Sequence, residues 1–489
     1  MPYTPATSTN TPETERTEGA TPVCSSRRSF LGLGAITASS YPRLLGANDR
    51  VQMGFIGCGI IARWHLADFK AMPDVDIAAT CDAYLPRAEQ CVADFSPQAK
   101  AYQDFRRVLE NKDIQAVCIS TPSHWHALMT IMACAAGKDV YVEKPVTVCV
   151  KEGRWMTEAA RRYQRVVQVG TQQRSGAHYQ KAATEVLRGY LGKIVSIRSG
   201  SVRNCMPGFG NPPDSAPPPG MDWDLFVGPA PMRPYNVNRG LYNFRWFWDY
   251  DGGQQTNMGT HEMDIVLWAL QVKGPTSVCS FGGRYALQDN CEVPDIQDSI
   301  LEFPGGCTAV FSYREASGGG RGIPVLWFYG TKGGMDLSRA GYRVYPDTRM
   351  PQNGHIPAAD KQPAIPPDGP RQLQGAAGDP GSLRAGREPW IQPLEMGPSS
   401  TRYGGMDLHA RNFIDCAKSR QRPNADIEGG HYATAACHLA NISLRLGGRK
   451  LRWDAEKEDF LDDREASAML SRPYRSPWDK ELRSLGFGA

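Results

Sequence analysis

The hydrophobic pattern of the chain is that of strands alternating with helices in its first half. Between residues 50 and 170, short apolar runs such as VQMGFI, VDIAATC and DIQAVCIS are each followed by a segment with helical spacing of its apolar positions. Continuous apolar runs of this length are typical of strands buried on both faces. Residues 48–171 are therefore predicted to form an α/β domain with a doubly wound parallel sheet.

The pattern changes after this point. VSIRSGSVR, TSVCSFGGRYAL and CTAVFSYRE are longer strand-like runs joined by turn-forming residues, which is typical of antiparallel pairing. Residues 172–405 are predicted to form a second, largely antiparallel α/β domain, in which 345–405 is a Pro/Gly-rich excursion without periodicity. Residues 406–489 are predicted to add returning helices and a tail.

Composition narrows the functional classes. The 489 residues carry a formal net charge of only +4, with 41% hydrophobic and 22% charged residues, so the composition indicates a globular protein without an electrostatic signal for nucleic acid. The 13 cysteines do not form CxxC pairs, and several lie in apolar runs. They are predicted to be free thiols, and no metal site is predicted.

The N-terminus resembles a targeting signal; a chance arginine pair before a short helix is the alternative. Residues 1–47 begin with a Thr-, Pro- and Glu-rich stretch that is predicted to be disordered. Arg27 and Arg28, followed by Phe30, Leu31 and a mildly apolar run, resemble a bacterial twin-arginine export signal. Export to the periplasm by the twin-arginine machinery is therefore expected, with cleavage or retention of the leader as a tether both open. Since this pathway exports folded proteins, it also predicts a bound cofactor.

A glycine-rich turn follows the first predicted strand. In GCGIIA, the first glycine permits a tight turn, the second lets the backbone approach a pyrophosphate, and the small last residue allows close helix packing. Asp82 ends the next strand, where a carboxylate accepts hydrogen bonds from an adenosine ribose and repels a 2′-phosphate. NAD is predicted, and NADP is less favoured; a structural turn with Asp82 as a helix cap is the alternative. The predicted cofactor residues here are Gly57, Gly59, Ile60, Ile61, Ala62 and Asp82.

The stretch VYVEKPVTV places a lysine at the end of a buried strand. Burying an ammonium group without a partner is costly, and Pro145 interrupts the strand at the same point. Open α/β sheets bind their ligands at the carboxyl ends of parallel strands. Lys144 is therefore predicted to meet a cofactor and substrate; a structural pairing with Glu143 is the alternative.

In their order, these motifs resemble the Gfo/Idh/MocA family (glucose–fructose oxidoreductase, inositol dehydrogenase and MocA). GxGxxA, CD, STPSHWH and EKP are followed by a histidine-bearing helix, and the likeness runs from about Arg50 to the C-terminus, with parts of the excursion excepted. The resemblance, closest to an exported branch, implies a Rossmann domain and a C-terminal domain whose open sheet often forms a subunit interface. A homo-oligomer, dimer or tetramer, is thus expected. It also implies hydride transfer between a nicotinamide and a carbohydrate.

The resemblance also implies roles for individual residues. Lys144 would lie beside the nicotinamide and the substrate hydroxyl, where it could stabilise a developing alkoxide, and Glu143 would shape the nicotinamide site. The family's D-x-x-x-H aligns with Asn257 to His261. An amide at the first position cannot ionise, so Asn257 could orient a hydroxyl or His261 but could not raise the basicity of the imidazole.

The segment DGGQQTNMGTHEMDIVLWAL is predicted to start a helix near Asn257. His261 and Asp264 are three residues apart and share one helical face, so His261 is predicted as general base, with Asp264 fixing its tautomer or binding a substrate hydroxyl. Polar residues after other strands complete the expected cofactor site, although a structural role for His126 is an open alternative. These additional cofactor residues are Thr121, Pro122, His126, Glu143, Lys144 and Gln172. The predicted substrate residues are Arg174, Tyr179, Arg203, Trp246 and His261, with Trp223, Tyr242, Phe244 and Arg245 as further candidates.

Three functions fit this pattern. An NAD(P)-dependent oxidoreductase with a tightly held cofactor is favoured, because both Lys144 and His261 are present. A redox-neutral, NAD-dependent glycosidase or lyase acting through a transient keto-sugar is the alternative. A non-catalytic sensor on the same fold is the third.

Overall fold

The computed structural model describes residues 50–317, 325–349, 388–400, 402 and 404–488. The leader with Arg27 and Arg28 lies outside the described residues, as does most of the excursion, residues 350–387. No helix in the described ranges is long and apolar enough to cross a membrane.

The first sheet is parallel and has six strands in the order β3-β2-β1-β4-β5-β6, which confirms the predicted doubly wound topology. Alternation of side chains sends Phe55 and Tyr141 to one face and Val117 and Val142 to the other, so both faces are apolar and both are covered. The strands are β1 (Val51–Ile56), β2 (Val75–Cys81), β3 (Lys100–Tyr102), β4 (Ala116–Ile119), β5 (Asp139–Val142) and β6 (Val167–Val169).

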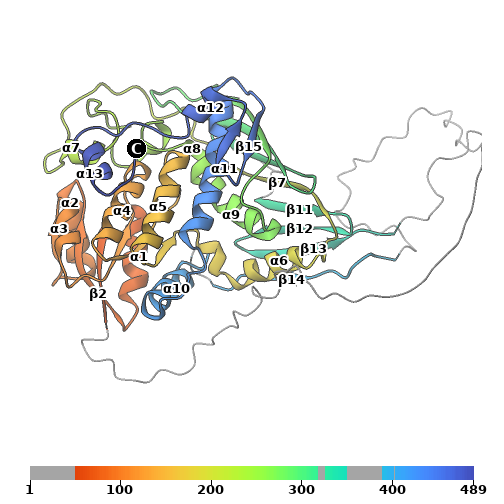
Figure 1. The fold of residues 1–489 in the computed structure, drawn as a ribbon, viewed down its shortest axis with the longest axis horizontal. Helices are drawn as coiled ribbons and strands as arrows, with labels where there is room; N and C mark the ends of the chain where they lie inside the picture. The colour runs from red at the N-terminus through yellow and green to blue at the C-terminus, as the bar shows by residue number, and fades with distance from the viewer. Residues whose placement is uncertain (1–49, 318–324, 350–387, 401, 403, 489) are drawn as a thin grey trace, which may run out of the picture. The chain divides into compact units, whose positions relative to one another are not determined.

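Helices from both ends of the chain cover this sheet (Figure 1). On the Tyr141 face, α10 packs beside α1 although about 340 residues separate them, and it contributes Phe413 to that core. On the other face, α4 and α5 pack together, and Trp478 from the C-terminal tail packs edge-to-face on Trp125. The helices of this part are α1 (Ile60–Lys70), α2 (Leu85–Phe95), α3 (Arg106–Glu110), η2 (Ser123–Trp125), α4 (His126–Ala135), α5 (Val150–Arg162), η3 (Gln172–Ser175), α10 (Met406–Ser419) and α13 (Trp478–Ser484).

The second sheet has ten strands in the order β14-β13-β12-β11-β7-β10-β9-β8-β15-β16. Only β7 and β10 pair in parallel, so the sheet is mostly antiparallel, as predicted. The strands are β7 (Ile194–Val202), β8 (Ser277–Gly283), β9 (Ile296–Phe303), β10 (Cys307–Arg314), β11 (Leu326–Gly330), β12 (Gly333–Ser338), β13 (Gly341–Pro346), β14 (Glu395–Met396), β15 (Leu451–Asp454) and β16 (Asp459–Leu461).

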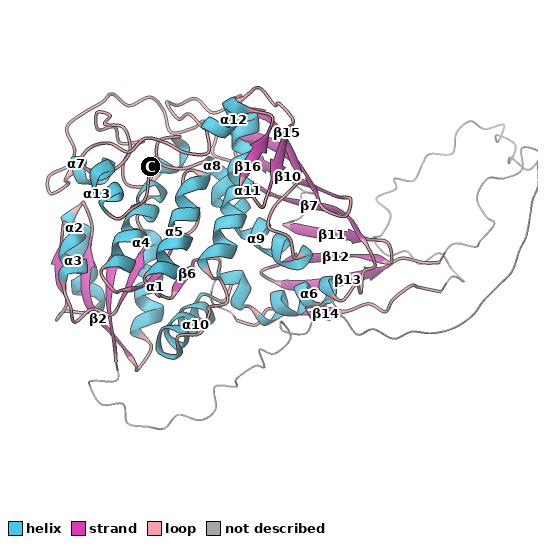
Figure 2. Cartoon of the chain, in the orientation of Figure 1, coloured by secondary structure: helices cyan, strands magenta, loops and turns pink. Residues whose placement is uncertain are grey.

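Helices α6, α9 and α11 lie together against one side of this sheet (Figure 2). Strand β9 shows the consequence, because its residues from Gln297 to Phe303 alternate between buried and exposed, with Leu301 in the core and Ile300 exposed. The remaining helices are α6 (Ala177–Leu187), α7 (Trp223–Val227), η4 (Asn243–Trp246), α8 (Gly253–Asn257), α9 (Gly259–Leu270), α11 (Ile427–Arg445) and α12 (Arg464–Ala468).

Candidate active site

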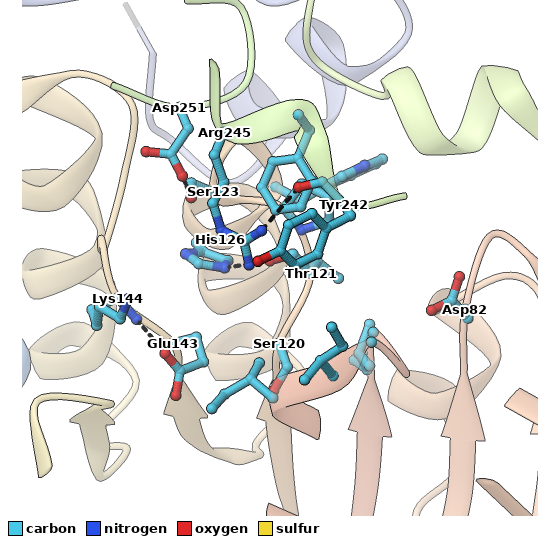
Figure 3. Close-up of a pocket in the computed structure, with 18 of the residues that line it drawn as sticks. Asp82, Ser120, Thr121, Ser123, His126, Glu143, Lys144, Tyr242, Arg245 and Asp251 are labelled. Carbon is cyan, nitrogen blue, oxygen red and sulfur yellow. Dashed lines mark hydrogen bonds between the residues drawn. The ribbon is translucent and has the colours of Figure 1, made fainter. Parts of the chain in front are cut away.

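A cavity of about 500 Å³ lies at the carboxyl ends of the parallel strands. Its floor comes from the residues after β1, β2, β4 and β5, and lining residues between 225 and 261 supply the opposite wall. Lys144 and Asp82 lie at opposite ends of it (Figure 3). The sheet therefore brings the two predicted halves of the site, cofactor and catalytic, into one pocket.

The glycine turn has the shape that a dinucleotide needs. Gly57 has a φ of +88°, and a Cβ there would lie 2.6 Å from the backbone of Ser120 and Thr121, so only glycine fits. A Cβ on Gly59, which precedes the first turn of α1, would meet open space. Ile60 and Ile61 line the cavity, whereas Ala62 is buried beneath it. The turn thus leaves an uncovered helix N-terminus that suits a pyrophosphate.

Asp82 lies in the cavity wall at the end of β2. One carboxylate oxygen accepts a hydrogen bond from the Cys58 amide at 2.7 Å, and the other accepts one from the Tyr84 amide at 2.8 Å. Burial raises the pKa of this carboxyl, and the two amides oppose the rise. The two amides hold the carboxylate in one orientation, and its remaining lone pairs are available to ribose hydroxyls.

Lys144 follows β5 and reaches across the pocket. Its ammonium donates to the backbone carbonyl and to the side-chain oxygen of Asn257, both at 3.0 Å. Glu143 accepts from the Lys144 backbone amide rather than from the ammonium, and its other oxygen lies 2.8 Å from Nε2 of His65. Burial lowers the pKa of Lys144. The lysine is therefore held by the opposite wall and not by Glu143.

The predicted helix near Asn257 is broken. The short helix α8 ends at Asn257, and α9 begins at Gly259 and carries His261. The Asn257 amide donates to Gln254 at 3.0 Å while its oxygen accepts from Lys144. Asn257 thus orients Lys144, and no hydrogen bond joins it to His261.

His261 lines the pocket as predicted, but its expected partner does not reach it. Nδ1 of His261 is buried without a hydrogen-bond partner, which leaves Nε2 to face the cavity. Asp264 instead accepts from Nε of Arg174 at 2.7 Å. Burial, reinforced by the charges of Lys144 and Arg339, lowers the pKa of His261 well below 6.5, so the imidazole is neutral at pH 7.

Four of the predicted substrate residues do not line the cavity. Arg174 donates a hydrogen bond to Asp264. Tyr179 is buried, and its hydroxyl accepts a hydrogen bond from Gln173. Arg203 and Trp246 both donate to the buried carboxylate of Glu315. These polar groups therefore form hydrogen bonds with other residues of the protein, outside the cavity. Of the further candidates, Trp223 stacks on Phe226 outside the cavity, while Tyr242, Phe244 and Arg245 line it.

The other predicted cofactor residues Thr121, Pro122, His126, Glu143 and Gln172 all line the cavity. The two ring nitrogens of His126 lie 2.8 Å from the Pro145 carbonyl and 2.9 Å from the Thr121 carbonyl, so this side chain braces two wall segments. Sequence reasoning missed several other lining residues, among them Asp251, Arg339 and Met406. It also missed His65, which contacts Glu143 from outside the cavity lining. Asp251 directly precedes the glycine pair of α8, which is the one available signal. Within the described ranges no cluster of side chains suits a metal ion, and the twelve described cysteines are free.

Comparison with known proteins agrees with this geometry. Residues 51–171 match a profile described as an oxidoreductase family with an NAD-binding Rossmann fold, and residues 203–311 and 399–480 match the C-terminal alpha/beta domain of that family. An inositol 2-dehydrogenase of Salmonella typhimurium is 28% identical over 149 residues, or 30% of this chain and 44% of the relative. A glycosyl hydrolase family 109 protein of Shewanella is 34% identical over 125 residues, or 24% of this chain and 27% of the relative.

This chain thus matches less than half the length of either curated relative. Among solved structures, a levoglucosan dehydrogenase in complex with NADH and levoglucosan aligns with a TM-score of 0.57 at 17% identity, covering 84% of this chain and 99% of that one. At this identity the likeness establishes the fold.

Proposed function

The chain belongs to the Gfo/Idh/MocA oxidoreductase family, and from that membership we propose that it is an NAD-dependent oxidoreductase acting on a hydroxyl-bearing carbon of a sugar, polyol or glycoside. One observation carries the proposal. Lys144 and the neutral His261 line the same cavity as the glycine turn and Asp82. The residues present fit NAD. Gly57 makes a turn that no other residue could make, Gly59 leaves open space before α1 for the pyrophosphate, and Asp82 is a fixed ribose acceptor.

In this proposal NAD, when bound, supplies the hydride acceptor. Lys144 donates a hydrogen bond to the substrate oxygen and stabilises the negative charge that develops there. Nε2 of His261 accepts the hydroxyl proton, which requires the neutral imidazole that burial provides. Asn257 holds the ammonium in place through two oxygen atoms.

The cofactor is proposed to be held tightly, because residues 220–246, here called the roof segment, pass over the cavity. The Gly220 carbonyl accepts from the Leu85 amide and from Gln103, and the Asp222 amide donates to Ala83. Farther along, the indole of Trp125 donates to the Leu225 carbonyl. Leu225, Phe226, Leu241, Tyr242, Phe244 and Arg245 from this segment line the cavity.

The proposal is tested first by the nucleotide that the purified protein releases on denaturation. Mass spectrometry is expected to find NAD, and Asp82→Ser is expected to reduce the preference for NAD over NADP, because the carboxylate that repels a 2′-phosphate is gone. Failure to bind either nucleotide would leave only the sensor interpretation.

Truncation of the Lys144 side chain is the second test. Lys144→Ala is expected to lower kcat by about 10²–10³-fold, as for loss of an oxyanion donor, while NAD binding persists. Lys151→Ala, an exposed lysine on α5, is the matched control. If Lys144→Ala turned over at the rate of the control, the catalytic role would be wrong.

The weaker alternative is redox-neutral glycoside cleavage through a keto-sugar, favoured by the similarity to the glycosyl hydrolase family 109 protein. The two activities give different products. An oxidoreductase produces NADH and ketone in equal amounts from a sugar, whereas the alternative cleaves a 4-nitrophenyl glycoside with no net NADH.

Two further features are proposed on separate grounds. Export by the twin-arginine pathway rests on Arg27 and Arg28 followed by Phe30 and Leu31, and loss of periplasmic protein in an Arg27→Lys/Arg28→Lys variant is its test. Homo-oligomerisation through the face of the large sheet opposite α6, α9 and α11 rests on exposed apolar side chains on four of its strands. They are Val195, Phe281, Ile300 and Tyr329.

A further inference from the structure

Three basic side chains gather at the Lys144 end of the cavity. Lys144, Arg245 and Arg339 all line it. Burial is the main cause of the lowered pKa of Lys144; the charge of Glu143 opposes the shift, as does that of Asp251, while those of Arg245 and Arg339 add to it. Figure 3 shows Arg245 above His126, on the Lys144 side and away from Asp82.

Arg245 is the unusual member of this group. One guanidinium nitrogen donates to the Tyr242 carbonyl at 2.9 Å, and the guanidinium lies over the rings of Tyr242 and Phe244 at 4.6 and 5.0 Å. Among the described residues it makes no ion pair with a carboxylate. Arg174 and Arg203, which do not line the cavity, are both paired with buried acids. A partly buried guanidinium without a counter-ion is costly unless a ligand supplies one.

The two acidic side chains at this end, Asp251 and Glu143, interact with groups other than Arg245. Asp251 accepts from the Ser123 hydroxyl at 2.6 Å and from the Thr256 hydroxyl at 2.8 Å. Glu143 interacts with His65 and with the backbone amide of Lys144. Neither carboxylate makes a hydrogen bond or an ion pair with Arg245, whose guanidinium donates to the Tyr242 carbonyl.

We propose that the substrate is a sugar acid whose carboxylate binds Arg245. This inference rests on the proposed function and adds the substrate class. The planar guanidinium offers two parallel donors that match a carboxylate, and Tyr242 and Phe244 hold its plane. The cofactor pyrophosphate is the less suitable occupant, because the glycine turn and the N-terminus of α1 already provide its site at Gly57 and Gly59.

The test is calorimetric titration of the NAD-loaded protein with matched sugars. D-Glucuronate and D-galacturonate are compared with D-glucose and D-galactose, and D-glucose 6-phosphate is the phosphate probe. At least one uronate is expected to bind about tenfold or more tightly than its neutral counterpart, the order of a charge-assisted hydrogen-bond pair. Arg245→Gln is expected to abolish this preference, and Arg245→Lys to keep part of it. Arg233→Gln, an exposed arginine of the same segment paired with Asp249, is the control.

Three results would overturn the inference. They are equal or weaker binding of both uronates relative to the neutral sugars, a preference for the phosphate probe, and a loss of NAD affinity in Arg245→Gln as large as its loss of uronate affinity. The last result would assign Arg245 to the cofactor. NAD affinity is measured separately, so failure of the proposed function, seen as absence of nucleotide binding, is distinct from failure of the substrate assignment.

Discussion

At the scale of single residues, the substitution of an amide for the family's carboxylate acts on Lys144 rather than on His261. Asn257 accepts from the ammonium without neutralising its charge. A carboxylate in the same place would favour the protonated lysine. The amide therefore leaves Lys144 with the lowered pKa that burial produces.

The pH profile of Asn257→Asp tests this role. Activity that needs a protonated Lys144 is lost as pH rises through the lysine pKa, which in the wild-type protein lies below its ordinary value. The variant is expected to move the alkaline limb of kcat up by about one pH unit or more. Asn257→Ala adds no charge and should not raise the limb. An unchanged limb in Asn257→Asp would contradict the role.

Glu262, next to His261 on α9, is a second buried group with a shifted pKa. Burial raises its pKa to about 7, and one of its oxygens has no hydrogen-bond partner. Because the unfolded carboxyl ionises near its ordinary 4.5, the folded state loses stability as pH rises from about 4.5 to about 7 and does not regain it above.

Glu262→Gln is therefore expected to be more stable than the wild-type protein at about pH 8, by about 3 kcal/mol at most, and close to it at about pH 5. Urea unfolding at the two pH values measures the difference. Glu158→Gln, an exposed glutamate on α5, is the matched control. A constant difference between variant and wild type across this range would show that Glu262 does not titrate there.

Local sequence predicted those site residues whose function depends on the turn or strand end that carries them. Gly57, Asp82 and Lys144 line the cavity, and each was predicted from the local signature of a glycine turn or a strand end. Arg174, Arg203 and Trp246, predicted as substrate residues, do not line the cavity. Their hydrogen-bond partners, Asp264 and Glu315, lie about 70 to 110 residues away along the chain. No local pattern distinguishes an arginine that pairs inside the protein from one that faces a ligand.

At the scale of elements, the position of the roof segment depends on the close packing of Gly228 against the indole of Trp125. Gly228 follows α7 with a φ of +53°, and a Cβ there would lie 2.1 Å from the indole of Trp125. Gly228→Ala is expected to displace the roof segment and to speed NADH release about tenfold or more, measured by stopped-flow fluorescence. Gly210→Ala introduces a side chain at a similarly positive φ of +70° but into open space, so it controls for backbone strain. Equal release rates in the two variants would contradict the role of the roof segment.

The strands and helices themselves were largely predictable, since apolar runs and helical spacing are local. The break between α8 and α9 was not, because Lys144 stabilises it through the Asn257 carbonyl, a contact between distant parts of the chain. The short edge strand β3 was also missed, as its three residues are exposed or half-buried and carry no apolar run.

At the scale of the whole molecule, the large sheet has one face covered by α6, α9 and α11 and one face bearing exposed apolar side chains. Phe281 is 62% exposed, and Ile300 lies on the adjacent strand. Phe281→Asp/Ile300→Asp is expected to convert the proposed homo-oligomer to a smaller species in light scattering, because a charge opposes burial at an interface. Leu408→Asp on α10 is the control. An unchanged mass would exclude this face as the interface.

The two hydrogen bonds from Lys144 to Asn257 have a stereochemical consequence. A lysine ammonium carries three N–H donors, and the carbonyl and amide oxygens of Asn257 use two of them. One donor remains, and its direction is fixed by the other two. A substrate oxygen can meet it from a single direction, while Nε2 of His261 must reach the proton of the same hydroxyl. Of two epimers that differ only at the reacting carbon, one alone can present its oxygen to both groups and its hydrogen to the cofactor.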